Sequence, residues 1–144
     1  MDNIIIRTVK KSDAKRIASL SVQLEHSMSE SEAKERLAVI LKNKTQALFV
    51  AQDKSEVLGY VSVSANYELL NGVQCRIGGL VVDAQARGRG LGTKLMAKAE
   101  EWAKSKGSKT MKLSSNVKRI DSHRFYEKIG YLKTKEQAAF SKKL

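Results

Sequence analysis

The chain has 144 residues, 42% of them hydrophobic and 29% charged, which is the balance of one folded globular domain and excludes a disordered chain. Its net charge of +12 is uneven: residues 84–144 carry 16 Lys and Arg against 5 Asp and Glu, which favours an anionic partner, either nucleic acid or a polyphosphate cofactor. No run approaches the roughly 20 apolar residues of a membrane span, the start lacks a basic leader, and Cys75 has no second cysteine, so we expect a cytoplasmic domain over residues 1–144 without a metal site.

The first third of the sequence predicts one strand and two helices. Residues 4–9 form an apolar run typical of a strand. A helix follows Lys11–Asp13, which offers an N-cap, because apolar residues then recur at helical spacing: Ala14, Ile17, Leu20 and Leu24. A second helix begins at Ser29–Glu32, a capping-box pattern, and runs to Leu41.

The rest of the chain alternates between strand and helix patterns. Strands are predicted over residues 47–51, 57–64, 74–82, 110–114 and within 137–142, with a turn at 53–56. Helices are predicted over residues 91–103 and 121–129, each ended by a glycine, Gly107 or Gly130. Strands that first pair through hairpins and are later joined through helices imply a mixed α/β sheet.

The most informative segment is the glycine-rich loop Arg87-Gly88-Arg89-Gly90-Leu91-Gly92-Thr93, which follows an apolar strand and opens a helix. Alternate glycines remove side chains where the backbone turns toward a ligand. Their amides, the helix N-terminus and two arginines are suited to phosphate oxygens. A P-loop would need Gly-Lys-Ser/Thr, and a dinucleotide loop would need Gly-x-Gly-x-x-Gly; neither pattern is present.

This loop resembles the Q/R-x-x-G-x-G/A signature of the GNAT superfamily of N-acetyltransferases, in its usual strand–loop–helix setting. The resemblance implies one GNAT-like domain, with a mostly antiparallel mixed sheet of six or seven strands flanked by about four helices. It also implies acetyl-CoA as cosubstrate, with its pyrophosphate on the loop and its pantetheine arm along the preceding strand. The residues that it places against the cofactor are Leu80, Val81, Val82, Arg87, Gly88, Arg89, Gly90, Leu91, Gly92 and Thr93.

A second motif, Phe125-Tyr126-Glu127-Lys128-Ile129-Gly130-Tyr131, resembles the family's F-Y-E-K-x-G-F/Y segment. The resemblance places Tyr126 near the cofactor sulfur, as a cofactor contact and as the general acid that protonates the departing thiolate. A tyrosine suits this step because its ordinary pKa is about 10 and that of a thiol about 8.5. A tyrosine that only packs and hydrogen-bonds is the alternative.

Four features depart from the family pattern, and the first, Ala84 in place of the proline that often follows the pantetheine strand, matters little. The asparagine often found seven residues before the tyrosine is replaced by Arg119, so Asn116 is the nearest candidate for that cofactor contact. The stretch Arg76–Leu80 has no carboxylate to serve as general base, and Glu68, after the third strand, is the best remaining carboxylate. Gly78-Gly79 predicts a bulge or a close approach of ligand.

The favoured function is therefore transfer of acetyl from acetyl-CoA to a primary amine, by direct attack in a ternary complex. The sequence does not identify the amine, which can belong to a small molecule or a protein, and a homodimer stays open. A non-catalytic acyl-CoA sensor on the same fold is the first alternative, because the strand glutamate is absent. A basic nucleic-acid-binding module is less favoured, because no aromatic-interleaved basic stretch is present.

Overall fold

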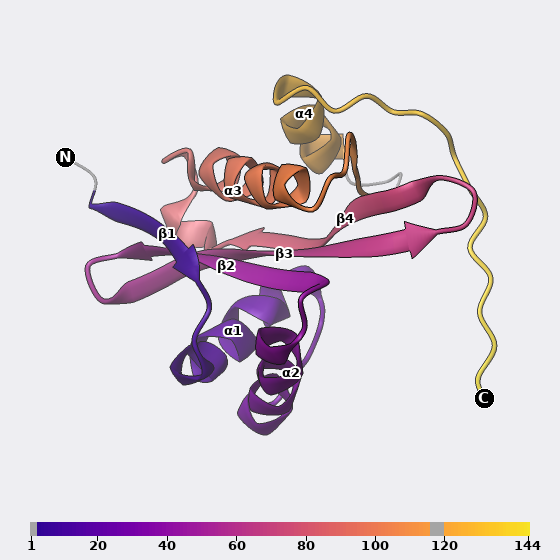
Figure 1. The fold of residues 1–144 in the computed structure, drawn as a ribbon. Helices are drawn as coiled ribbons and strands as arrows, with labels where there is room; N and C mark the ends of the chain where they lie inside the picture. Colours follow the sequence, from indigo (N-terminus) through magenta and orange to yellow (C-terminus); the bar gives the residue numbers. More distant parts are fainter. Residues whose placement is uncertain (1–2, 116–119) are drawn as a thin grey trace. The chain divides into compact units, whose positions relative to one another are not determined.

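A five-stranded sheet forms the centre of the computed structural model, which describes residues 3–115 and 120–144 (Figure 1). The strands lie in chain order: β1 (Ile4–Thr8), β2 (Gln46–Asp53), β3 (Glu56–Glu68), β4 (Gly72–Val82) and β5 (Met111–Lys112). The first three pairings are antiparallel and the pairing of β4 with β5 is parallel. The predicted mixed, mostly antiparallel sheet is thus confirmed, with five strands among the described residues rather than six or seven.

Helices cover both faces of this sheet. Figure 1 shows α1 (Ala14–Ser21) and α2 (Glu30–Lys42) on one face and α3 (Leu91–Ser105) on the other. In the described part of the chain, three single-turn 3₁₀ helices accompany them: η1 (Lys11–Asp13), η2 (Val22–Leu24) and η3 (Ala84–Ala86). With α4 (Ile120–Lys128), the described chain has the four α-helices that were predicted. None of the described helices is both long and apolar enough to cross a membrane.

The chain divides into two units, the first ending at Leu113 and the second beginning at Ser114. The sheet, α1, α2 and α3 belong to the first unit, and α4 belongs to the second. Residues 137–142, predicted to contain a strand, have no regular secondary structure. The physical reason is that an extended segment becomes a strand only when a neighbouring strand accepts its hydrogen bonds, and the described second unit has no strand.

The N-terminus of α2 confirms the predicted capping box. The Ser29 hydroxyl accepts a hydrogen bond from the Glu32 amide at 3.0 Å, and the Glu32 carboxylate accepts one from the Ser29 amide at 3.0 Å. Two amides that the helix leaves without intrahelical acceptors are satisfied in this way.

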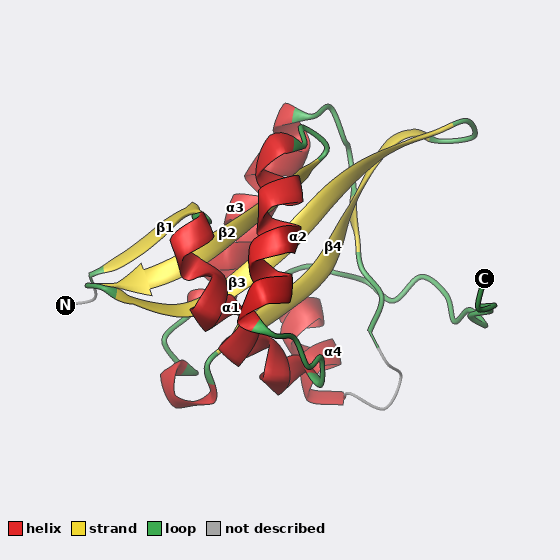
Figure 2. Ribbon diagram, turned by 90° about the horizontal axis from the view of Figure 1, so that it is seen from below, coloured by secondary structure: helices red, strands yellow, loops and turns green. Residues whose placement is uncertain are grey.

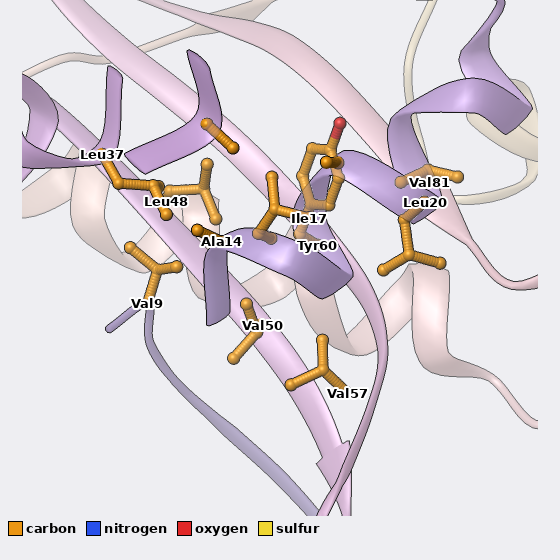
Figure 3. Packing of buried hydrophobic residues seen from close by; sticks show 12 residues of the cluster. Val9, Ala14, Ile17, Leu20, Leu37, Leu48, Val50, Val57, Tyr60 and Val81 are labelled. Carbon is orange, nitrogen blue, oxygen red and sulfur yellow. The ribbon is translucent and has the colours of Figure 1, made fainter. Parts of the chain in front are cut away.

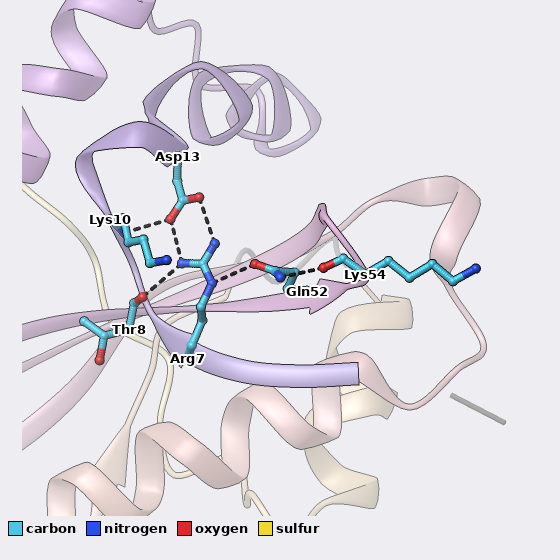
Figure 4. Close-up of polar contacts among 6 residues, drawn as sticks. All are labelled: Arg7, Thr8, Lys10, Asp13, Gln52 and Lys54. Atoms are coloured by element: carbon cyan, nitrogen blue, oxygen red, sulfur yellow. Dashed lines mark hydrogen bonds and ion pairs between the residues drawn. The ribbon is translucent and has the colours of Figure 1, made fainter. Parts of the chain in front are cut away.

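Arg7 of β1 joins the edge of the sheet to the start of the first helical segment (Figure 4). Its guanidinium donates two hydrogen bonds of 2.9 Å to the Asp13 carboxylate and one of 2.8 Å to Gln52 of β2. Asp13 also accepts the Lys10 amide at 2.7 Å, so it caps the first turn from within. Burial alone would raise the pKa of Asp13, but these hydrogen bonds outweigh it and hold the pKa below its usual range.

The core between α1, α2 and the sheet is built from aliphatic side chains (Figure 3). Leu20, Leu37 and Val50 are at most 2% exposed. Tyr60 of β3 lies among them, and its hydroxyl shares a hydrogen bond of 2.7 Å with the buried Ser21 of α1. Burial raises the pKa of Tyr60, so this pair holds α1 against β3 through a neutral hydroxyl.

Candidate functional site

The edge of β4 that faces β5 is open along half of its length. Among the described residues β5 pairs only with Cys75 and Arg76. From residue 77 to 82, β4 therefore has β3 on one side and no described strand on the other. Such an edge presents unpaired amides and carbonyls, and an extended ligand can add to it as a strand would.

Two residues of this open segment direct their backbone groups outward. The Asp83 amide donates to the Leu58 carbonyl of β3 at 2.8 Å, so the backbone N–H and C=O of Asp83 point toward β3. Backbone groups alternate along an antiparallel strand. Val82 and Leu80 therefore present their amides and carbonyls at the open edge, whereas those of Val81 point toward β3. Val81 instead buries its side chain in the core at 4% exposure.

The predicted bulge lies in the middle of β4. Ser62 pairs with Gly79 and Val63 pairs with Ile77, so Gly78 is the extra residue. A Cβ on Gly78 would come within 2.7 Å of the Ser62 hydroxyl. One on Gly79 would meet Leu24 of η2 at 3.7 Å, an ordinary contact. The glycine pair thus leaves this part of β4 without side chains, beside the open edge.

The glycine loop turns the chain from β4 into α3 through two left-handed residues. Gly88 has φ +85° and Gly90 has φ +76°. No atom lies within 4 Å of a Cβ built on either one, so conformation rather than lack of space requires glycine at both positions. Gly90 is the N-cap of α3, and its carbonyl accepts the first helical hydrogen bond, from Lys94 at 3.1 Å.

The N-terminus of α3 differs from that of α2 in having no side-chain cap. The helix itself supplies no acceptor for the amides of Leu91, Gly92 and Thr93. These amides and the helix dipole together favour an anion at this end. The residues present therefore fit a diphosphate, as the sequence predicts for positions 87–93.

The two arginines of the loop have different surroundings. Arg89 forms an ion pair with Asp53, at the end of β2, with 2.8 Å between Nη2 and the carboxylate oxygen. Arg87 is exposed, and its Nε donates to the outward carbonyl of Val82 at 3.4 Å. Arg89 is thus anchored to the β-turn that follows β2, a partner that no local sequence pattern predicts, and Arg87 lies over the end of the open edge.

Asp83 caps the start of the loop. Its carboxylate accepts the Gln85 amide at 3.1 Å and is paired with Arg16 of α1. The hydrogen bond from Arg16, with that from Gln85, holds the pKa of Asp83 below its ordinary value. Arg16 also donates to the Val57 carbonyl at 2.7 Å, so one side chain of α1 fixes both β3 and the start of the loop. No local pattern identifies Arg16, because its partner is 67 residues away.

The second unit carries Tyr126 on α4. Its ring packs edge-on against Phe125, with 5.2 Å between centroids, and against Tyr131, with 6.0 Å. The helix ends as predicted, at Gly130 with φ +102°, and the Tyr131 amide donates to the Tyr126 carbonyl at 2.9 Å. The role of Tyr126 as general acid stays a prediction. Asn116, the expected cofactor contact, lies outside the described residues.

Glu68 lies at the opposite end of the sheet from the loop. Leu80 pairs with Val61, and Glu68 is seven residues further along β3. At about 3.3 Å per residue this separates Glu68 from Leu80 by about 23 Å. This separation is too long for direct proton transfer to Glu68 from an amine at Leu80. Glu68 accepts a hydrogen bond of 3.1 Å from Asn71 in the β3–β4 hairpin.

A cavity of about 380 Å³ adjoins this hairpin. It was not predicted, since its lining comes from β2, β3, β4 and β5 and the segment before β2: Thr45, Gln46, Ser64, Ala65, Asn66, Glu68, Gln74, Cys75, Arg76 and Lys112. The first unit thus has two features of functional interest, the loop at one end of β4 and this polar cavity at the other.

Comparisons of the sequence and of the structure with known proteins both lead to N-acetyltransferases. A model of the acetyltransferase (GNAT) family matches residues 13–131. The aminoalkylphosphonate N-acetyltransferase of Salmonella typhimurium is 39% identical over 83 residues, which are 57% of this chain and 54% of that protein, so the match spans about half of the relative.

Two solved structures show that the fold is of the GNAT type. An aminoglycoside N-acetyltransferase in complex with CoA has a TM-score of 0.90 and 20% identity, covering 100% of this chain and 97% of that chain. The glucosamine-6-phosphate N-acetyltransferase of Arabidopsis thaliana has a TM-score of 0.84 and 25% identity, covering 97% and 99%. The predicted fold class is confirmed.

Proposed function

Because this chain belongs to the GNAT acetyltransferase family, we propose that residues 1–144 form one N-acetyltransferase domain that transfers acetyl from acetyl-CoA directly to a primary amine. The observation that carries the proposal is the uncapped N-terminus of α3, which follows two left-handed glycines and adjoins the open edge of β4. A diphosphate and an amide-containing arm need these two features side by side.

In this proposal the loop and the strand bind different parts of the cosubstrate. The amides of residues 87–93 hold the diphosphate, with the charge of Arg87 beside them. Leu80 and Val82 pair with the pantetheine arm through their outward backbone groups, and Val81 supports them from the core. Asp53 keeps Arg89 in place, and Arg16 keeps the start of the loop in place through Asp83.

The reaction forms one bond and breaks one. Acetyl-CoA supplies a thioester, whose carbonyl carbon bonds to the amine nitrogen while the carbon–sulfur bond breaks. The Leu80 amide stabilises the oxyanion that develops on the carbonyl oxygen in this proposal. The ammonium group loses one proton to water or a carboxylate before attack, and Tyr126 donates a proton to the departing sulfur. The nitrogen loses its second proton as the amide forms, and this proton, carried by water, restores the Tyr126 hydroxyl. The products are an N-acetyl amide and the free thiol of CoA.

The names of the similar proteins support an amine as the acceptor. These proteins are named for an aminoalkylphosphonate, glucosamine 6-phosphate and aminoglycosides, and each of these compounds carries an amine. Acetyl transfer to an amine therefore has support from several relatives. We also propose that the protein acts in the cytoplasm, where the buried thiol of Cys75 would stay reduced.

The direct test measures release of CoA thiol from acetyl-CoA with a panel of primary amines, together with the mass of the acetylated product. We expect release that depends on the amine and equals the N-acetyl product formed. Coenzyme A should also raise Tm. If Tm rises while no amine increases release above hydrolysis, the non-catalytic acyl-CoA sensor becomes the better description. Salt-sensitive RNA binding stronger than coenzyme A binding would instead favour the nucleic-acid module.

A further inference from the structure

The polar cavity lies on the face of the sheet that α1 and α2 cover elsewhere. Tyr60 of β3 points into the core against these helices. Side chains alternate along a strand, so Ser64, Asn66 and Glu68 point to the same face. Arg76 pairs with Ser64 and therefore shares that face. Figure 2 shows β3 and β4 running on beyond α1 and α2, which leaves this part of the face uncovered by them.

The lining of the cavity is cationic. Arg76 of β4 and Lys112 of β5 are register partners in the parallel pairing, so their side chains lie next to each other on this face. Glu68 is the single carboxylate among the lining residues that the structure describes. The other polar lining residues are neutral donors and acceptors: Thr45, Gln46, Ser64, Asn66 and Gln74. An arginine beside a lysine, with hydroxyls and amides around them, is a donor set for an oxyanion.

Between the cavity and the proposed reaction site, β4 has two residues without side chains, Gly78 and Gly79, with Leu24 of η2 3.7 Å from a Cβ built on Gly79. Four residues along β4 separate Arg76 from Leu80, a distance of about 13 Å between backbones when the strand is fully extended. Gly78 and Gly79 occupy the middle of that stretch. A molecule bound at Arg76 can therefore extend across the glycine pair toward the outward amide of Leu80, while the arginine and lysine side chains shorten the distance to be spanned.

We propose that the acceptor is a small primary amine that also carries an oxyanion, a phosphonate, phosphate or carboxylate, which Arg76 and Lys112 bind in this cavity. Its amine then lies over Gly78 and Gly79 beside Leu80. The inference rests on the proposed function, since it names the acceptor of that same reaction. It assigns the specificity to residues at the far end of β4 from the cofactor loop.

The first experiment compares matched amines by steady-state kinetics with saturating acetyl-CoA. The pairs are 2-aminoethylphosphonate with ethanolamine, and glucosamine 6-phosphate with glucosamine. We expect kcat/KM to be at least about 10-fold higher for the oxyanion member of one pair or both, the effect of one to two charge-assisted hydrogen bonds. Equal kcat/KM within both pairs, with turnover present, would overturn the proposal and leave the proposed function standing.

Substitutions test which residues produce the preference for an oxyanion amine. Arg76→Gln and Lys112→Gln should each raise KM for the oxyanion amine about 10-fold, without changing KM for its neutral partner or the Kd for CoA. Lys34→Gln, at an exposed position of α2, is the matched control and should change none of these values. Gly79→Ala tests the path: the fold tolerates its methyl, and KM for the oxyanion amine should rise several-fold. Equal changes for both members of a pair would count against an oxyanion site.

A binding measurement separates this inference from the proposed function. Calorimetric titration with 2-aminoethylphosphonate should show binding that Arg76→Gln weakens about 10-fold, whether or not turnover occurs. If no amine is acetylated but this binding and its loss are observed, the proposed function fails and the oxyanion site stands. If wild type and Arg76→Gln bind the phosphonate equally, or neither binds it, the site is wrong.

Discussion

The two ends of β4 are built in opposite ways. At the C-terminal end, one continuous segment, residues 82–93, supplies backbone amides, left-handed glycines and a helix N-terminus. At the N-terminal end, the cavity is lined by side chains from four strands and the segment before β2, and its two cations come from positions 36 residues apart, Arg76 and Lys112. The first end depends on backbone conformation and the second on side-chain chemistry.

This difference explains why one end identifies the family and the other does not. A diphosphate is bound by backbone amides that every residue type except proline possesses, so its site constrains glycines and little else. An acceptor is selected by side chains, and these can be replaced without disturbing the strand pairing. We therefore expect cofactor binding to fail when the loop backbone is altered, and acceptor preference to change when the cavity side chains are altered.

The largest expected effect comes from Tyr126, which belongs to the second unit. Tyr126→Phe removes the proposed proton donor and should lower kcat by about 100-fold, since general acid catalysis contributes on that order. The Kd for CoA and the KM for the amine should change little, which would separate chemistry from binding at either end of β4. Thiol-release kinetics measures all three. Tyr131→Phe, a ring in contact with Tyr126, is the control and should keep most of the rate. Full activity of Tyr126→Phe would remove its assignment as the acid.

The second effect distinguishes the two ends of β4 directly, because each end has a glycine with a left-handed backbone conformation. Gly90 (φ +76°) lies in the loop and Gly72 (φ +69°) begins β4 at the hairpin, and no atom lies within 4 Å of a Cβ built on either. Alanine at either position should cost about 1–2 kcal/mol of stability because of the left-handed conformation. Only Gly90→Ala should also weaken the binding of CoA, because it shifts the amides of α3. We expect the Kd measured by calorimetry to rise about 10-fold. Equal Kd values for the two variants would contradict a backbone-based cradle.

The third effect is smaller and decides the role of Glu68. As a cavity carboxylate it repels an anionic acceptor, so Glu68→Gln should lower KM for 2-aminoethylphosphonate about 3-fold and leave kcat unchanged, the scale of a partly screened charge. If Glu68 were the general base, the Glu68→Gln substitution would instead lower kcat for every amine. Steady-state kinetics with 2-aminoethylphosphonate and ethanolamine separates the two outcomes. Glu35→Gln, on the exposed face of α2, is the matched control.

The smallest effect concerns the ion pair between Asp83 and Arg16, which holds the start of the glycine loop. Arg16 and the Gln85 amide lower the pKa of Asp83 in the folded state, so its carboxylate adds stability above the unfolded pKa of about 4 and loses it as pH falls through the folded value. Asp83→Asn should therefore lower Tm by about 3 °C at pH 7. The difference from wild type should shrink below pH 4. Thermal unfolding followed by circular dichroism across this range checks it, and an unchanged gap at low pH would contradict the ion pair.

The helices and most strands were predictable because their signals are local. The Ser29–Glu32 capping box, the left-handed Gly107 and Gly130 after two helices, and the bulge at Gly78 all follow from side chains within a few residues of the feature. The strand predicted within 137–142 was wrong because a strand also needs a partner, and propensity alone says nothing of the partner.

The candidate site was predictable only where it is continuous in the chain. The glycine spacing determined the left-handed turn into α3, where we propose that a diphosphate binds, because φ preferences act on single residues. The pairing of Arg89 with Asp53, the anchoring of Asp83 by Arg16 and the meeting of Arg76 with Lys112 came from strand register and helix packing. Those contacts depend on the tertiary structure, since side chains far apart in sequence meet only after the sheet has set their register.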